Sequence, residues 1–320
     1  MAKERFPAQY REKYAAILGS EFDRFIAAFD TKAKKTLWCN SILTTPKELC
    51  KELAGRGFEL SPLELSKNAF QIDSGPERPG QDEAFAQGRF NLQEKAAMLP
   101  PIALGAMPGE RILDAFAAPG NKTLQLCCMC NNSAEITCLE RDPTRIGTLK
   151  FNARKYGMQI DAKKLDFQKF KDREGFDRIL LDAPCSSEGM ARKRLDALDE
   201  WSQHKVENMS KRQKKAIVRG FDLLKEGGTL VYSTCSLSPE EDEEVIDHLL
   251  SNRTGAKVEK TKIAGVKASK GILQYKEKGF DTQVENCSRL WPHEWDCQPF
   301  FYAKITKEKQ AGAAKTGNGG

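Results

Sequence analysis

Two cysteines each close a strand-like run, Cys185 in Asp182-Ala-Pro-Cys-Ser-Ser and Cys235 in Ser233-Thr-Cys-Ser-Leu. A thiolate can add to an electron-poor ring carbon. Carbon 5 of a cytosine is a poor nucleophile until a thiolate adds at carbon 6. A thiol beside an acid and a methyl-donor pocket therefore points to methylation of a pyrimidine carbon, and the rest of the chain must supply that pocket.

The segment before these cysteines has the features of a donor pocket. An apolar run that contains Asp114 leads into the turn Ala117-Ala-Pro-Gly-Asn-Lys122 and then a helix-like stretch. Ligands of open parallel sheets bind just beyond the carboxyl ends of the strands. Gly120 lacks a Cβ and would let the chain approach a ligand closely. Glu140 ends the next run about 20 residues on, where an acid can hold a ribose hydroxyl. These features favour a nucleoside-bearing cofactor over a bare phosphate.

Strand-like and helix-like stretches alternate through the rest of the chain. Helical stretches such as 144–156 and 205–224 separate strand-like runs that end near Phe116, Glu140, Asp166, Ala183 and Cys235. Such alternation predicts βαβ units and a mainly parallel sheet with helices on both faces. The acidic run after Pro239 is expected to open another helix, with its acids where the helix dipole favours them.

Composition permits an anionic partner without requiring one, since 51 Lys and Arg against 45 Asp and Glu give a net charge of only +6. The basic stretches 192–194, 205–215 and 304–315 are either RNA-phosphate contacts or solvated surface.

No apolar run reaches the ~18–20 residues that span a membrane. The ten cysteines and three histidines lack metal-ligand spacing, so we expect no metal. Because the sequence shows neither a membrane-spanning run nor a secretory leader, we expect a reducing cytoplasm. Cys127, Cys128, Cys130 and Cys138 are interpreted as core residues.

These residues together resemble the NSUN (Nop/Sun) family of S-adenosylmethionine-dependent RNA cytosine-5 methyltransferases. The resemblance is carried by Asp-Ala-Pro-Cys-Ser and Ser-Thr-Cys-Ser in this order, and it runs from Gln93-Glu94 to Arg289-Leu-Trp-Pro-His293 and Phe300–Lys304. It covers about two-thirds of the chain. It implies a Rossmann-like class I methyltransferase fold, α/β with a mainly parallel seven-stranded sheet, a late antiparallel strand at Phe300–Ile305 and a small N-terminal α/β accessory domain.

Four chain segments are expected. Apolar residues at about a 3.6-residue period predict an N-terminal docking helix within 1–30. An accessory α/β RNA-binding unit follows at 31–85, with a helix at 46–54 that Gly55 and Gly57 end. The turn-rich stretch 73–80 is its predicted linker to a methyltransferase domain at 86–307. A basic disordered tail takes 308–320.

The resemblance implies roles for four catalytic residues. Cys235 is the nucleophile, and Cys185 assists the elimination that frees the product. Asp182 holds the cytosine edge and favours protonation at N3, and Lys122 orients the reacting groups or lowers a thiol pKa. Structural thiols, a strand-end acid and a surface lysine are the alternative interpretations.

The resemblance also implies a set of S-adenosylmethionine contacts. The turn wraps the methionine end, Glu140 holds the ribose hydroxyls, Asp166 takes the adenine amino group, and Arg145 borders the ligand. Asp114 braces the turn from behind. An ordinary surface role is the alternative for each acid. The complete cofactor set is Phe116, Ala117, Ala118, Pro119, Gly120, Asn121, Lys122, Glu140, Arg145, Asp166 and Asp182.

Some positions depart from the family pattern or stay open. Trp38 stands two residues before Asn40, where an Arg is frequent, and Asn121 stands where glycine is frequent. His293 either contacts substrate or closes the core. Rival functions are methylation of an exocyclic amine, which needs no thiol, and a non-catalytic RNA-binding or assembly factor. The expected partner is RNA, tRNA first and ribosomal RNA second, and the expected state is a monomer.

Overall fold

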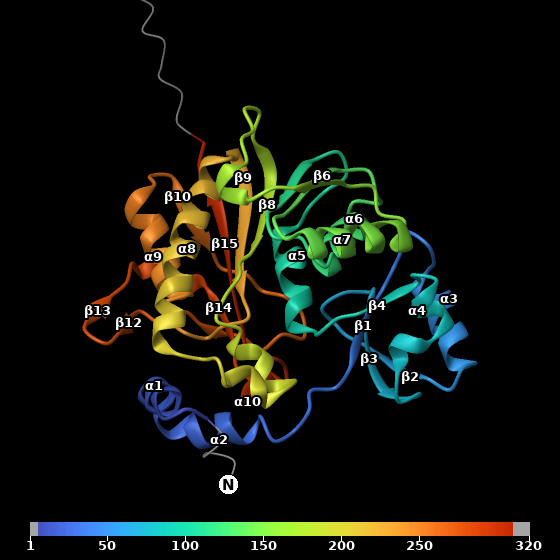
Figure 1. The fold of residues 1–320 in the computed structure, drawn as a ribbon, viewed down its shortest axis with the longest axis horizontal. Coiled ribbons are helices and arrows are strands. Elements are labelled where there is room, and N and C mark those ends of the chain that lie inside the picture. Colours follow the sequence, from blue (N-terminus) through green and yellow to red (C-terminus); the bar gives the residue numbers. More distant parts are fainter. Residues whose placement is uncertain (1–5, 310–320) are drawn as a thin grey trace, which may run out of the picture.

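The computed structural model describes residues 6–309, which form one large sheet, one small sheet and a hairpin with helices around them (Figure 1). The α-helices are α1 (Ala8–Leu18), α2 (Phe22–Ala27), α3 (Pro46–Ala54), α4 (Glu83–Ala86), α5 (Leu99–Leu104), α6 (Asn121–Met129), α7 (Pro143–Tyr156), α8 (Gln203–Asp222), α9 (Glu243–Asn252) and α10 (Pro292–Trp295). The strands are β1 (Thr36–Cys39), β2 (Glu59–Pro62), β3 (Ala69–Ser74), β4 (Phe90–Leu92), β5 (Arg111–Asp114), β6 (Glu135–Glu140), β7 (Asp161–Lys164), β8 (Phe176–Asp182), β9 (Leu224–Thr234), β10 (Ala256–Glu259), β11 (Ser269–Lys270), β12 (Gln274–Tyr275), β13 (Lys278–Gly279), β14 (Ser288–Leu290) and β15 (Phe300–Lys307). Across 6–309, none of the helices has the length and apolar character needed to cross a bilayer.

The large sheet has the order β11-β14-β15-β9-β8-β5-β6-β7, and β10 pairs with β15 outside this path. The five strands from β9 to β7 run parallel, while β15 is antiparallel to β9, as the late strand was expected to be. The sheet has nine strands instead of seven, because β14 and β11 continue its antiparallel edge beyond β15. The fold is the expected Rossmann-like methyltransferase fold.

Helices cover both faces of this sheet because its strands are apolar on both faces. Ile112 and Ile136 pack with α5, α6 and α7, whereas their neighbours Leu113 and Leu139 pack with α8 and α9. Each fully buried Leu or Ile contributes about 1.5–3 kcal/mol. Strand residues alternate between the faces, so burial on both sides fixes the register and hence which residues reach the carboxyl edge.

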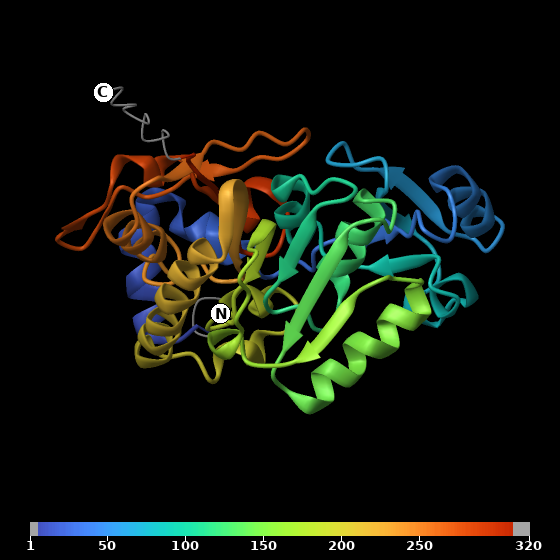
Figure 2. The same ribbon diagram turned by 90° about the horizontal axis from the view of Figure 1, so that it is seen from above.

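The N-terminal segment forms two helices, not one. Gly19 follows α1 with φ of +52°, a backbone conformation that breaks the helix before α2 begins. Tyr14 and Phe25 of these helices pack against Trp201 and Trp291. The two helices lie beside the α8–α9 half of the molecule, while the small sheet lies beside the α5–α7 half (Figure 1, Figure 2). Residues 1–5 are outside the described part of the chain.

The small sheet β2-β3-β1-β4 is antiparallel and carries α3. The predicted helix 46–54 is confirmed: Thr45 and Glu48 cap its start reciprocally, and Gly55 follows its last residue. Asn40 donates hydrogen bonds to the carbonyls of Gly88 and Tyr156, which ties this unit to the end of α7.

The stretch 73–80 is not the connection between two domains. It joins β3 to α4 inside the accessory unit, because β4, on the far side of this stretch, supplies the strand next to β1. The unit thus continues past residue 85 to Leu92. The predicted basic tail 308–320 lies outside the described residues from 310 onward.

Candidate active site

Four carboxylates stand at the carboxyl edge of the parallel strands. Asp182, Asp114 and Glu140 end β8, β5 and β6, and Asp166 follows β7. Since these four strands are neighbours in this order, the acids form one row across the edge where ligands of such sheets bind. The sequence therefore predicted correctly that these acids lie at one edge of the sheet.

Asp114 lies behind the turn. Its carboxylate is buried and accepts a hydrogen bond of 2.8 Å from the Thr123 hydroxyl, in the first turn of α6. Burial raises the pKa of Asp114 to about 6, an effect that the Thr123 hydrogen bond partly offsets. The side chain thus fastens the start of α6 to the end of β5, which is the bracing role expected for it.

Lys122 and Asp182 form an ion pair at the β8 end of the row. Lys122 Nζ lies 2.7 Å from Asp182 Oδ2, and Ser233 Oγ donates to Asp182 Oδ1 at 2.8 Å. Ser233 is the direct partner of Asp182 in the β8–β9 register, so the strand pairing itself places this donor. Lys122 Nζ also lies 5.4 Å from the centre of the Phe300 ring. The carboxylate is therefore held on both oxygens, and Ser233 is a site residue that the sequence interpretation missed.

The two thiols meet although 50 residues separate them. Cys185 Sγ lies 3.1 Å from Cys235 Sγ, and both cysteines are free. The pKa of Cys185 is raised well above its usual value, first by its hydrogen bond to Cys235 and then by burial. Cys185 therefore stays protonated and can donate to the Cys235 sulfur, which is half-buried.

A buried carboxylate holds the loop that carries Cys185. Glu241 accepts hydrogen bonds from Ser186 N at 2.8 Å, from Ser186 Oγ at 2.5 Å and from Gln213 Nε2 at 3.1 Å. Gln213 also donates to the carbonyl of Pro184 at 2.9 Å. Burial, together with the charge of Glu188, raises the pKa of Glu241 to about 7. We call Glu241 and Gln213 the loop clamp.

The acidic run after Pro239 opens a helix, as expected, with Glu243 and Glu244 in the first turn of α9. The sequence did not indicate that residues 240–243 are buried. Each has a partner from another element: Glu240 pairs with Lys13, Asp242 accepts from Thr234, and Glu243 pairs with Arg289. The sequence signal for buried, paired acids was the number of consecutive acids after Pro239. Acids are rarely buried without partners, so each of these needs one from another element.

A cavity of about 420 Å³ lies beside the row, lined by Phe116, Glu140, Asp166, Phe167 and Pro184 among others. Its residues fit an adenosyl group, because apolar and aromatic walls suit a base and the two carboxylates can accept from ribose hydroxyls and an amino group. Glu140 is 6% exposed and is held by Arg145 at 3.2 Å and by the N–H of Asp142 at 2.9 Å. Arg145 also donates to the carbonyl of Ala118, so it links Glu140 to the turn.

A second cavity of about 150 Å³ contains the ion pair. Its lining includes Phe116, which it shares with the first cavity, and Ala117, Ala118, Pro119, Asn121, Lys122 and Asp182. The thiols follow Asp182 and Ser233 closely in the chain but are not among its lining residues. The turn thus separates a larger cavity from a smaller one.

Gly120 lines neither cavity. It has φ of +110°, and a Cβ there would lie 2.9 Å from Leu149 Cδ1 of α7. The glycine is therefore required by the turn and by the packing of α6 on α7. This packing reason stands beside the expectation that Gly120 lets the chain approach a ligand closely.

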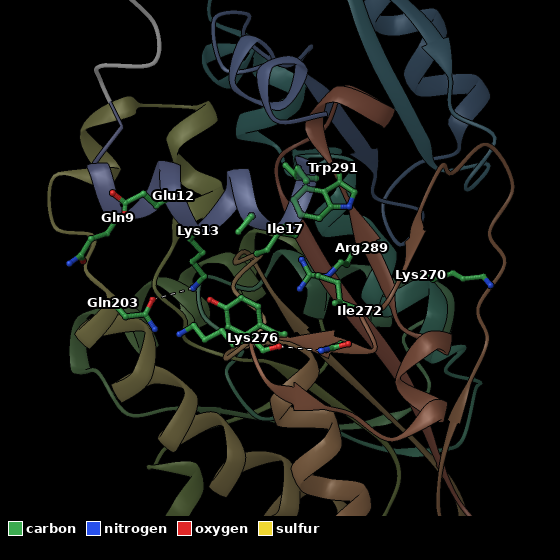
Figure 3. A pocket seen from close by; sticks show the side chains of 14 residues that line it. Gln9, Glu12, Lys13, Ile17, Gln203, Lys270, Ile272, Lys276, Arg289 and Trp291 are labelled. Carbon is green, nitrogen blue, oxygen red and sulfur yellow. Dashed lines mark hydrogen bonds between the residues drawn. The ribbon is translucent and has the colours of Figure 1, made fainter. Parts of the chain in front are cut away.

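A larger crevice of about 600 Å³ lies between α1 and the β12–β13 hairpin (Figure 3), and neither Cys185 nor Cys235 is among its lining residues. Two of the cations that line it are paired with buried acids, Lys13 with Glu240 and Arg289 with Glu243. Size alone therefore does not identify the site; the convergence of the acids, the lysine and the thiols does.

Several expected residues lie outside the site. His293 packs on Phe25 and Trp291 and lies 3.9 Å from Glu21, so it closes the core. Trp38 is 1% exposed and packs in the core. The side chain of Trp38 is not at the surface, so it cannot make the substrate contact that an Arg at this position could make. Cys127, Cys128, Cys130 and Cys138 are buried core residues, as expected.

Comparison with known proteins agrees with this geometry. The 16S rRNA methyltransferase RsmB/F family model matches residues 101–306, and the model of the N-terminal domain of 16S rRNA methyltransferase RsmF matches residues 6–95. The tRNA (cytosine(49)-C(5))-methyltransferase of Pyrococcus abyssi is 35% identical over 93% of this chain and 95% of its own length. Ribosomal RNA small subunit methyltransferase F of Vibrio cholerae is 33% identical over 88% of this chain, which spans 59% of that relative. The crystal structure of a methyltransferase homolog protein from Pyrococcus horikoshii has a TM-score of 0.85 at 27% identity and covers 94% of this chain and 95% of its own. The chain belongs to the RsmB/F (Nop/Sun) family of S-adenosylmethionine-dependent RNA cytosine-5 methyltransferases.

Proposed function

We propose that this protein methylates carbon 5 of a cytosine in tRNA through a covalent bond between Cys235 and carbon 6. The observation that carries the proposal is the pair of thiols, 3.1 Å apart, beside the Lys122–Asp182 ion pair. The relative that this chain spans almost completely is a tRNA methyltransferase, which favours tRNA over other RNAs.

In the first step Cys235 loses its proton to solvent, and Sγ adds to carbon 6. Electron density moves onto carbon 5, which becomes the nucleophile. Asp182 holds the N3 edge of the base and favours protonation there, which makes carbon 6 more electrophilic. Lys122 and Ser233 keep that carboxylate in place.

The cofactor is held by the turn 116–122 with Glu140 and Asp166. When bound, S-adenosylmethionine supplies the methyl group as an electrophile for carbon 5. In the larger cavity Glu140 holds the ribose hydroxyls and Asp166 the adenine amino group. Phe116 lines this cavity and also the smaller cavity of the ion pair, which other residues of the turn line as well. Arg145 positions Glu140.

In the last step the proton on carbon 5 passes to water, its electrons restore the ring double bond, and the bond between carbon 6 and Sγ breaks. Cys235 departs as a thiolate. Cys185, kept protonated by its raised pKa, donates a hydrogen bond to that sulfur and stabilises the leaving group.

Three variants test this chemistry with tritiated S-adenosylmethionine and a tRNA transcript. Cys235→Ala should abolish methyl transfer and adduct formation, and Cys185→Ala should accumulate a protein–RNA adduct that survives denaturation. Cys50→Ala, a half-buried cysteine of α3, is the matched control and should keep wild-type activity. Full activity of Cys235→Ala would refute the mechanism, and loss of activity without an adduct in Cys185→Ala would refute the release role.

Ribosomal RNA is the second candidate substrate, favoured by the family model and the 33% identity to methyltransferase F. Bisulfite sequencing of total RNA with and without the gene decides between them: loss of a tRNA mark supports the proposal, and loss of a ribosomal mark replaces it. No change in either would favour the non-catalytic RNA-binding function. We place the reaction in the cytoplasm, since all ten cysteines are free, and expect a monomer.

A further inference from the structure

A groove of about 350 Å³ opens next to the cavity that holds the ion pair. The lining of the groove includes Lys32, Ala33, Lys34, Lys35 and Thr36, the segment that joins α2 to β1. We call residues 32–35 the lysine strap. The groove and the ion-pair cavity share five lining residues, namely Leu92, Gln93, Glu94, Lys193 and Gln298. The two are therefore one continuous depression.

The strap is fixed at both ends. The buried guanidinium of Arg192 donates to the carbonyls of Ala28 and Cys297, which fastens the chain just before the strap to the catalytic domain. At the other end, the Thr36 hydroxyl donates to the Gln93 carbonyl, and the Gln93 N–H donates to the Thr36 carbonyl at 3.1 Å. The strap backbone is thus held over the depression by bonds that do not use its lysine ammonium groups.

The groove presents positive charge, because four of its lining lysines are exposed: Lys32, Lys34, Lys35 and Lys193. The acid in its lining, Glu94, accepts hydrogen bonds from the N–H groups of Ala96 and Gln298 and also attracts the charge of Lys193, so it offsets Lys193 more than the lysines of the strap. Lys34 lies 3.8 Å from Asp73 in an exposed and hence weak pair, and Lys35 donates to an uncharged backbone carbonyl. In the crevice of Figure 3, by contrast, Lys13 and Arg289 are paired with buried acids.

The inner cavity limits what the groove can hold. A volume of about 150 Å³ around Lys122 and Asp182 has room for one base and not for a base pair. A target base must therefore be unstacked and unpaired when it reacts. Its neighbouring phosphates then have to lie at the mouth of that cavity, and the mouth is the groove.

We propose that the lysine strap binds the phosphates of single-stranded RNA that flanks the target cytosine and so delivers the base to Asp182. This inference rests on the proposed function. Lys193 lies at the junction of groove and cavity, next to the target nucleotide, while Lys32, Lys34 and Lys35 follow the strand outward. The lysines contact the phosphates of the RNA and not its bases, so this interaction has no sequence preference of its own.

The test compares two triple variants in binding to a 12-nucleotide single-stranded RNA at several salt concentrations. The strap variant is Lys32→Ala/Lys34→Ala/Lys35→Ala. The control is Lys257→Ala/Lys260→Ala/Lys262→Ala, an equal loss of exposed charge on and after β10. Strand β10 pairs with the end of β15 that lies away from the thiols.

Removing one phosphate contact should lower the slope of log affinity against log salt by about 0.7, which gives a decrease of about 2 for the strap variant. The control should keep the wild-type slope, and binding of the duplex form of the same RNA should differ little between the two variants. A strap variant with the slope of the control would overturn the proposal, as would an equal loss for single strand and duplex. The unfolding midpoint of each variant checks that the fold is intact.

Binding is measured without turnover, so the result stands even if the wild-type protein methylates neither tRNA nor ribosomal RNA. With an active substrate, the strap variant should show a raised KM for RNA and an unchanged kcat at saturation. A reduced kcat with unchanged KM would place the strap in the chemistry and refute the binding role.

Discussion

Replacing Glu241 tests whether the loop clamp sets the position of Cys185. The carboxylate lies fully buried and accepts three hydrogen bonds, two of them from Ser186, the residue after Cys185. Glu241→Ala leaves these donors buried without an acceptor. Glu241→Gln can keep all three contacts, because its oxygen accepts from Ser186 N and Gln213 while its amide donates to Ser186 Oγ.

The two variants differ in magnitude and in pH dependence. Three unsatisfied donors at about 1–3 kcal/mol each predict that Glu241→Ala lowers the free energy of unfolding by roughly 3–9 kcal/mol. In the wild type the folded-state pKa of Glu241 is about 7, against 4.5 for an ordinary glutamate. The folded state therefore binds more protons between these pH values, so its stability falls as pH rises through this window, by about 3 kcal/mol in total. Glu241→Gln has no such proton and no such loss.

Urea unfolding at pH 5, 6, 7 and 8 measures both effects. The stability of Glu241→Gln relative to wild type should increase from pH 5 to pH 7 and then level off, while Glu241→Ala should be the least stable of the three at every pH. At 25 °C and pH 7, Glu241→Gln should still methylate RNA. The reasoning is refuted if Glu241→Gln is destabilised as much as Glu241→Ala, or if its stability relative to wild type does not change with pH.

Three further substitutions test the elements that position the site. Gly120→Ala should lower the free energy of unfolding by about 2 kcal/mol in a urea titration, because φ is +110° and the new Cβ would lie 2.9 Å from Leu149. The control is Gly147→Ala in α7, where a Cβ meets nothing within 4 Å. This control should be neutral or stabilising. Thr123→Val should lower the free energy of unfolding by about 1–3 kcal/mol, and by more above pH 6, where Asp114 is charged. Thr123→Ser should keep wild-type stability. Equal stabilities of the two variants would contradict the bracing role of Asp114. Ser233→Ala should lower kcat roughly tenfold with little change in KM for RNA, because Asp182 loses one of the two side chains that bind its carboxylate. An unchanged kcat in steady-state assays would show that Ser233 has no part in the site.

Local patterns were sufficient to predict the alternation of strands and helices and the edge on which the acids lie. The helix 46–54 followed from its cap residues, and the row of Asp182, Asp114, Glu140 and Asp166 followed from strand ends. Both depend on sequence periods and end signals, which the chain carries locally. The family resemblance rested on two short motifs in a fixed order, and the comparisons confirmed it.

Other features depended on contacts between distant segments and had no local signal. The stretch 73–80 looks like a linker, yet it connects elements of one unit, because a strand beyond it completes the small sheet. The acids 240–243 indicated a helix start but not their burial against partners from α1, the Cys185 loop, β9 and β14. Gly120 looks like a ligand contact, yet its missing side chain makes room for Leu149.

The sequence alone determined the reactive residue types, their order and the strand ends that carry them, because those properties follow from covalent chemistry and local backbone preference. Only the tertiary structure decided that Cys185 and Cys235 lie 3.1 Å apart, that Ser233 and Lys122 share Asp182, and that the groove of the lysine strap adjoins the cavity of the ion pair. Distances of that kind depend on strand register and on which buried groups find partners, and both are properties of the whole packed chain.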